Sequence, residues 1–248
     1  MLIVANWKAY VETKEKAKEL FALSKRLSTA IKRVRIILLP PAPFLAFLAQ
    51  GNRTKISFGA QDISMTTIGA STGEVSGTML KQSGATYVLI GHSERRALGE
   101  TNDTVQQKVR RALSVGLTPI ICVGEKERDH DAQYLSYIKE QIQAVFEPLT
   151  VPERLKVVIA YEPVWAIGKS AGDALPEREV GEMVLYIRKI IGHYLLGKSA
   201  QKIPILYGGS VEPENIRGLA GGAHVDGFLI GHASVQKDMF RETVRALV

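Results

Sequence analysis

Four polar residues in this 248-residue sequence each follow a short apolar run, and their types suit proton transfer. They are Asn6, Lys8, His92 and Glu162. A lysine, a histidine and a glutamate on one concave face, with no Cys or His pair at metal-ligand spacing, fit proton transfer next to a carbonyl better than hydrolysis or redox chemistry. In that chemistry the carboxylate is the base, and the other groups stabilise negative charge on oxygen. No metal is expected.

Glu162 is predicted to lie at the carboxyl end of a strand. The preceding run, Val157 to Tyr161, is continuously apolar, as in a parallel strand covered on both faces. Pro163 cannot donate to a strand ladder, so the strand must stop at Glu162. In isolation, such a carboxylate is equally compatible with capping a helix or pairing with a surface arginine. A catalytic interpretation depends on the other strand ends.

His92 follows Ile90-Gly91 and precedes Ser93-Glu94-Arg95-Arg96, which predicts a short helix beginning beside it. The N–H dipoles of that helix would disfavour the imidazolium form. A histidine after a strand can also be a hydrogen-bonded filler, and the expected neighbours Lys8 and Glu162 favour the catalytic interpretation. The remaining histidines considered, His130, His193 and His224, are interpreted as structural.

Glycine-containing turns follow two further predicted strands, at Gly208-Gly209-Ser210 and at Gly231. Turns at the ends of the last two strands of a barrel often bind phosphate through backbone N–H groups. A Gly-Gly pair is also common where a tight turn needs a positive φ. Together with the other strand ends, these turns indicate a phosphate-bearing ligand.

These residues are connected by eight strand and helix pairs. The predicted strands are 2–5, 35–39, 55–60, 87–90, 118–123, 157–161, 203–207 and 227–230, and the predicted helices are 17–27, 44–50, 75–82, 101–115, 133–146, 176–196, 214–220 and 234–247. Thr101 or Asn102 is expected to cap the fourth of these helices and Ser234 the last. Eight parallel pairs in about 250 residues predict a single-domain α/β protein, a closed (β/α)8 barrel over residues 1–248. An open, doubly wound sheet is the alternative.

The composition limits the partners. The net charge is +7, from 32 Lys and Arg against 25 Asp and Glu, and basic residues are interspersed with acids on amphipathic helices. This pattern favours a small anionic metabolite over nucleic acid or a membrane surface. The lone Cys122 allows no internal disulfide, and no apolar run reaches the roughly 18 residues that span a bilayer. No signal peptide is expected. A cytoplasmic protein is expected.

One motif match is discounted. Gly192 to Ser199 fits the P-loop pattern, but that loop must follow a strand and open a helix. Here the pattern lies at the end of a predicted helix, so no nucleotide site is expected.

Four multi-residue motifs resemble those of the triosephosphate isomerase family, in the same order and over the whole chain. They are Asn6-Trp7-Lys8, Gly91-His92-Ser93-Glu94-Arg95-Arg96, the stretch from Tyr161 to Gly168, and Tyr207-Gly208-Gly209-Ser210. Shorter matches occur at Gly59-Ala60-Gln61, Thr72-Gly73-Glu74 and Cys122-Val123-Gly124-Glu125.

The resemblance implies a TIM barrel that interconverts dihydroxyacetone phosphate and D-glyceraldehyde 3-phosphate, in glycolysis and gluconeogenesis, without a cofactor. It implies that Glu162 moves the proton between the carbons and that neutral His92 polarises the carbonyl. Lys8 and Asn6 would stabilise the enediolate, with Glu94 as a supporting acid beside Lys8. These roles come from the resemblance.

The resemblance also implies a lid and a phosphate site. The lid comprises Pro163, Val164, Trp165, Ala166, Ile167 and Gly168, and the substrate-binding residues are Asn6, Lys8, Gly168, Ser210, Gly231 and His232. By the same likeness, Glu125 would bind the Trp165 indole in the open state, and Tyr207 would hold the closed state.

The family resemblance further implies a homodimer. The loop around Thr72 would insert into a second subunit near Asn6 and Lys8. Glu74 and Arg95 would then form a pair across the interface.

Three stretches depart from the family pattern. Lys169 to Leu175 is one residue longer than the usual lid tip, so the register of the tip is open. His232 replaces a second glycine, and its backbone would be more strained than that of glycine if the turn requires a positive φ. Ala9-Tyr10 replaces the usual Met-Asn after the lysine, which affects the expected subunit contact more than the reaction. A phosphosugar barrel of another pathway and a non-catalytic basic barrel are the competing interpretations.

Overall fold

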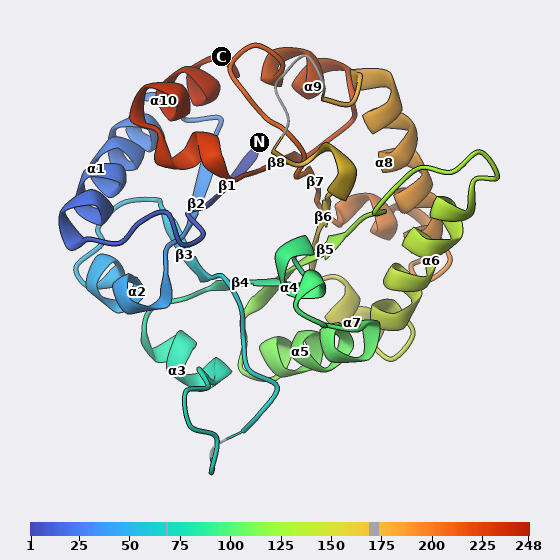
Figure 1. Ribbon diagram of the computed structural model, residues 1–248, viewed down its shortest axis with the longest axis horizontal. Helices are drawn as coiled ribbons and strands as arrows, with labels where there is room; N and C mark the ends of the chain where they lie inside the picture. The colour runs from blue at the N-terminus through green and yellow to red at the C-terminus, as the bar shows by residue number, and fades with distance from the viewer. Residues whose placement is uncertain (68, 169–173) are drawn as a thin grey trace.

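The eight strands close into a parallel barrel in chain order (Figure 1). The computed structural model describes residues 1–67, 69–168 and 174–248. The strands are β1 (Leu2–Asn6), β2 (Arg35–Leu39), β3 (Ser57–Ala60), β4 (Tyr87–Ile90), β5 (Thr118–Val123), β6 (Val158–Tyr161), β7 (Ile205–Tyr207) and β8 (Gly227–Ile230). The first strand pairs in parallel with both β2 and β8, which closes the sheet. The predicted (β/α)8 barrel is confirmed, and the open sheet is excluded.

Helices surround the barrel, as Figure 1 shows. The longer ones are α1 (Lys14–Ala30), α2 (Ala42–Ala49), α3 (Gly77–Gln82), α5 (Asn102–Ser114), α6 (Gln133–Phe146), α8 (Glu177–Gly192), α9 (Ile216–Gly222) and α10 (Lys237–Arg245). Two shorter α-helices are α4 (Ser93–Ala97) and α7 (Val151–Arg154), and the 3-10 turns are η1 (Val164–Ala166), η3 (Gly197–Lys202) and η4 (His232–Val235). The sequence pattern did not predict α7. Thr101 caps α5, as one of the two expected caps.

The prediction that Ser234 caps the last helix is wrong. Ser234 lies inside η4, and its hydroxyl donates to the Gly231 carbonyl at 2.6 Å. The chain first makes this 3-10 turn over the end of β8, so α10 begins only at Lys237. Helix α8 also ends four residues before the predicted Leu196, at Gly192. The P-loop-like stretch therefore runs from a helix end into η3 and follows no strand.

The core has two layers, one on each face of the sheet. Side chains inside the barrel form one cluster, Val4, Ile37, Leu39, Leu89, Ile120, Cys122, Val158, Ala160, Leu206 and Leu229. The alternate strand residues pack outward against the helices. Burial, and after it the charge of Glu162, raises the pKa of the Cys122 thiol, so this cysteine behaves as a core residue. In the described ranges, no helix combines the length and apolar character needed to cross a bilayer.

A buried ion cluster joins the segment after β3 to α5. Lys108 contacts Glu100 and Asp62, and both Lys108 and Glu100 side chains are nearly buried, at 5% and 6% exposure. Arg95 donates to Glu100 at 2.9 Å and lies 3.1 Å from Asp62. Burial opposes ionisation of Glu100, but hydrogen bonds from Lys108 and Arg95 outweigh it and hold the pKa of its carboxyl below the usual value.

Glu100→Gln is expected to lower the free energy of unfolding by about 3 kcal/mol at pH 7, because it leaves Lys108 buried with one carboxylate fewer. The folded pKa of Glu100 is depressed, so its contribution is complete above the ordinary carboxyl pKa of about 4.3 and is lost as pH falls through the folded value. The difference between native chain and variant should therefore shrink below about pH 4. Urea unfolding of the native chain and the variant, at pH 7 and below about pH 4, measures this difference in unfolding free energy.

Glu182→Gln is the matched control, since Glu182 pairs with Arg178 at the surface, where both side chains are more than half exposed. We expect a change below about 1 kcal/mol there. Equal losses in the two variants would contradict a special role for the buried cluster.

Candidate active site

A cavity of about 370 Å³ opens at the carboxyl ends of the strands. It brings together the following sequence-predicted residues: Asn6, Lys8, His92, Glu162, Gly168, Ser210, Gly231 and His232. Glu94 does not line the cavity but bonds to Lys8 at its edge. Barrel closure thus gathers polar side chains that lie far apart in the sequence.

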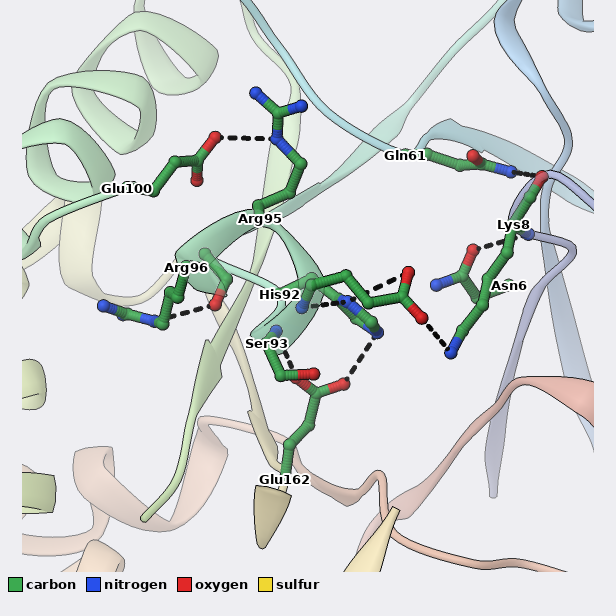
Figure 2. Close-up of polar contacts among 11 residues, drawn as sticks. Asn6, Lys8, Gln61, His92, Ser93, Arg95, Arg96, Glu100 and Glu162 are labelled. Atoms are coloured by element: carbon green, nitrogen blue, oxygen red, sulfur yellow. Dashed lines mark hydrogen bonds and ion pairs between the residues drawn. The ribbon is translucent and has the colours of Figure 1, made fainter. Parts of the chain in front are cut away.

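Lys8 is held in an unusual backbone conformation, with φ at 47°. Its N–H donates to Asn6 Oδ1 at 3.1 Å, and its carbonyl accepts from Gln61 Nε2 at 2.9 Å. The same Gln61 amide donates to the Leu39 carbonyl. The Lys8 ammonium lies 2.6 Å from Glu94 Oε1, so Figure 2 shows the side chain reaching from the end of β1 toward α4. A non-glycine residue with positive φ persists only where its surroundings fix it, as these bonds do.

His92 is the N-cap of α4, which confirms the short helix predicted beside it. Its Nδ1 accepts the Glu94 N–H at 3.2 Å, so this nitrogen carries no proton in that bond. The hydrogen-bond pattern therefore assigns the proton of the neutral ring to Nε2, which lies 3.2 Å from Glu162 Oε1. The imidazole presents an N–H donor to the cavity.

Glu162 is 2% exposed, and each of its two oxygens lies beside a polar group. One oxygen accepts the Ser93 N–H at 3.3 Å, and the other faces His92 (Figure 2). A Cβ at Gly208 would lie 2.9 Å from Glu162 Cγ, so the glycine leaves the space that the carboxylate fills. The carboxylate is therefore largely buried and lines the cavity.

Sequence reasoning gave no role to two residues that support this site, Gln61 and Arg96. Arg96 donates to the Gly91 carbonyl at 2.8 Å and to Asn102 Oδ1 at 2.9 Å, which fixes the turn from β4 into α4. Burial lowers the pKa of Arg96, although it remains a cation. A polar residue directly after a strand can be predicted to lie at the site. Gln61 is such a residue, whereas Arg96 does not directly follow a strand.

The segment Pro163 to Gly168, the predicted lid, is held by a backbone bond from the Val164 N–H to the Glu125 carbonyl at 2.9 Å and by side-chain bonds. The Trp165 indole donates to Glu125 Oε1 at 3.1 Å, and the Ala166 carbonyl accepts from the Ser210 hydroxyl at 3.0 Å. The Arg128 guanidinium lies 5.4 Å from the Trp165 ring centre. The Trp165–Glu125 bond is the one expected for an open lid. Of the lengthened tip, positions 169–173 lie outside the described residues.

Glu125 accepts hydrogen bonds from several residues beside the segment Pro163 to Gly168. It is 1% exposed, and its Oε1 also accepts from the Tyr161 hydroxyl at 2.9 Å and from Arg128 at 3.1 Å. Burial, followed by the Glu125 charge, raises the pKa of Tyr161. The sequence gave no role to Arg128, which bonds the nearby Glu125 but also Tyr161 and Glu179, both far from it along the chain.

His232 adopts no positive φ, so the backbone strain considered for it does not arise. It is the first residue of η4, directly after Gly231. A Cβ at Gly231 would lie 3.3 Å from Lys8 Cε, so the glycine makes room for the lysine stem. The turn and the lysine form one continuous wall of the cavity.

The fold and this convergence of base, imidazole and ammonium at the strand ends define a (β/α)8-barrel enzyme. The family model described as Triosephosphate isomerase matches residues 1–247. The chain belongs to the triosephosphate isomerase family. The expected isomerase is thereby confirmed.

Several curated relatives carry the name Triosephosphate isomerase. The protein from Roseiflexus sp. (strain RS-1) is 40% identical over 251 residues, covering 99% of this chain and 97% of the relative. Those from Citrifermentans bemidjiense and Moorella thermoacetica are 41% and 40% identical over 248 residues, each covering 98% of this chain and 97% of the relative. The similarity therefore extends over the whole barrel.

Proposed function

We propose that this protein interconverts dihydroxyacetone phosphate and D-glyceraldehyde 3-phosphate, without a cofactor, in glycolysis and gluconeogenesis. The observation that supports it best is the contact of His92 Nε2 with Glu162 Oε1 at 3.2 Å, with the Lys8 ammonium at the same cavity. A neutral imidazole donor, a buried carboxylate and a fixed cation together suit enediolate chemistry.

In the proposed reaction, Glu162 removes a proton from the carbon beside the substrate carbonyl. The electron pair moves toward the carbonyl oxygen, where the His92 N–H donates and the Lys8 and Asn6 groups stabilise the developing charge. His92 transfers protons between the two oxygens, and Glu162 returns its proton to the neighbouring carbon. Glu94 supports Lys8 through their 2.6 Å contact. No atom is gained or lost, as an isomerisation requires.

The lid and the glycine turns are proposed to bind the phosphate. Gly168, Ser210, Gly231 and His232 line one end of the cavity, where backbone N–H groups suit an anion. Closure of Pro163 to Gly168 would exclude water and so suppress elimination of phosphate from the enediolate.

Tyr207 supports this closure because its hydroxyl is buried without a hydrogen-bond partner among the described residues. The backbone of Leu175 lies close but outside hydrogen-bond geometry. Burial raises the pKa of Tyr207 to about 12, so the group stays a neutral donor. Such an orphaned hydroxyl is well placed to bond the closed lid.

Tyr207→Phe is therefore expected to leave the unfolding free energy within about 1 kcal/mol of the native value, since no bond is lost in the open form. The same change should lower kcat/KM by about 10- to 100-fold, the worth of one bond made only on closure. Steady-state kinetics and urea unfolding measure the two effects. A stability loss matching the kinetic loss would contradict the closure role.

We also propose a cytoplasmic homodimer in which residues 1–248 form one domain. Figure 1 shows the connection from β3 to α3 projecting beyond the helices. A hollow beside it is lined in part by three exposed apolar side chains, Met65, Val75 and Leu98. The proposed cross-subunit pair of Glu74 and Arg95 would add to the contacts that Arg95 makes in its own chain with Asp62 and Glu100. Light scattering tests the dimer.

The direct test of function is turnover of D-glyceraldehyde 3-phosphate by the native chain, coupled to reduction of the ketone product. We expect kcat/KM near the diffusional ceiling of about 10⁸–10⁹ M⁻¹s⁻¹. A folded but inactive native chain would refute the proposal. Salt-dependent retention on DNA together with inactivity would favour the basic-barrel interpretation instead.

A further inference from the structure

Two rings meet at the mouth of the cavity, Tyr10 after β1 and His232 after β8. Their centroids are 6.1 Å apart and their planes are inclined at 79°, an edge-to-face arrangement. Both side chains are exposed, and both line the same cavity as Lys8 and Glu162. The contact requires both rings, so replacing either residue with one that has no ring removes it.

The contact joins two loops beyond the end of the ladder between β1 and β8. The last pair in the ladder between β1 and β8 is Ala5 with Ile230, below both loops. Beyond it, the Ser234 hydroxyl reaches the Asn6 carbonyl only at 3.4 Å. The ring contact therefore adds to this long hydrogen bond beyond the strand ladder.

Lys8 belongs to the loop after β1, and its side chain reaches the turn after β8. Its backbone has a φ of 47°, and its stem passes over Gly231, where a Cβ would lie 3.3 Å from Lys8 Cε. Separation of the loops would move the ammonium away from the backbone amides of Gly231 and His232. A contact that holds the two loops together would keep the ammonium and these amides at fixed relative positions.

We propose that Tyr10 and His232 act as a coupled positioning pair that holds the Lys8 loop against the turn at Gly231. The pair keeps the ammonium and the turn amides in a fixed arrangement around a small phosphate monoester. This inference rests on the proposed isomerase function. Loss of the pair relaxes this arrangement but keeps both the Lys8 charge and the base Glu162, so it weakens substrate binding more than it slows proton transfer.

The test compares Tyr10→Asn, His232→Gly and the double variant. We expect each single change to raise KM for D-glyceraldehyde 3-phosphate, and the inhibition constant of inorganic phosphate, by about 3- to 10-fold, the scale of one aromatic contact. The turnover number should fall by a smaller factor than KM rises, because the Lys8 charge and Glu162 are both retained. The double variant should match the larger single effect, because either change already breaks the contact.

Two further variants separate the contact from general damage. Tyr10→Phe keeps the ring and should restore the native KM. His193→Gly removes an exposed histidine at the end of α8, away from the cavity, and should leave KM unchanged. Light scattering of every variant checks the oligomeric state.

The proposal is overturned if the single effects multiply in the double variant, or if Tyr10→Phe is as damaging as Tyr10→Asn. It is also overturned if KM rises only in variants whose oligomeric state changes, because the role would then be in assembly. If the native chain is active and both single variants keep the native KM, the positioning role of Tyr10 and His232 is refuted, while the proposed isomerase function stands. An inactive native chain refutes the proposed function, and the pair with it.

Discussion

Glu162→Gln is expected to lower kcat/KM for D-glyceraldehyde 3-phosphate by about 10³- to 10⁴-fold, the largest effect predicted for this chain. Glutamine has nearly the same shape, and its amide oxygen can still accept the Ser93 N–H that the carboxylate accepts at 3.3 Å. It cannot remove a proton from carbon. The loss should therefore fall on kcat, with little change in KM, as steady-state kinetics would measure.

Glu94→Gln is the matched comparison at the same site. The Glu94 side chain is 60% exposed and contacts the Lys8 ammonium, so the change weakens an ion pair and removes no base. We expect a loss of about tenfold or less. Equal losses in the two variants would contradict the assignment of Glu162 as the sole base, and a shifted unfolding midpoint in Glu162→Gln would indicate damage to the fold.

The fold was predictable because its signals are local. Each strand appeared as a short apolar run, and each run ended at a residue that breaks a strand or carries a polar group, such as Pro163 after Glu162. Eight repeats of strand and helix leave few ways to pair parallel strands, and closure follows from their number. The same reasoning placed Asn6, Lys8, His92 and Glu162 at one face, and the cavity brings them together.

The contacts of the supporting residues were not predictable, even where a residue directly after a strand could be placed at the site, because their partners are distant in sequence. Gln61 bonds the Lys8 carbonyl, 53 residues away, and Arg128 bonds the Tyr161 hydroxyl, 33 residues away. A glutamine or an arginine carries no pattern that announces such a partner. The Ser234 error has a local cause, since a serine before a helix resembles an N-cap even when its hydroxyl closes a preceding turn.

The contact between Tyr10 and His232 shows a further limit. In the sequence these were two unrelated departures from the family pattern, at opposite ends of the chain. Pairing of β1 with β8 brings their loops together, and only then do the rings form one feature. Because the barrel closes, two positions that the sequence presented separately now support one hypothesis, that Tyr10 and His232 act as a pair.

Lys8→Met is expected to lower kcat/KM by about 10³-fold through both a lower kcat and a higher KM, as steady-state kinetics would measure. Lys8 is the one permanently charged cation among the described residues that line the cavity, and its side chain is only 16% exposed. A charge in such a site is worth far more than in water, both to a bound phosphate and to a developing enediolate. Methionine keeps the length of the stem without the charge.

The fold should tolerate Lys8→Met. The φ of 47° strains methionine no more than lysine, and the Asn6 and Gln61 bonds use only the backbone of residue 8. The lost pair with Glu94 is largely exposed on the carboxylate side and contributes less than about 1 kcal/mol to stability. Unfolding in urea should therefore give nearly the native midpoint.

Lys32→Met distinguishes a local role of Lys8 from long-range attraction of an anionic substrate. Lys32 is exposed and does not line the cavity, yet its removal lowers the net charge of +7 by the same single unit. Attraction at a distance is screened by salt, with a Debye length of about 8 Å at physiological ionic strength. We expect a small loss in Lys32→Met that disappears in high salt, whereas the loss in Lys8→Met persists. If salt removed both losses alike, Lys8 would act by steering, and the proposed stabilisation of the enediolate would be wrong.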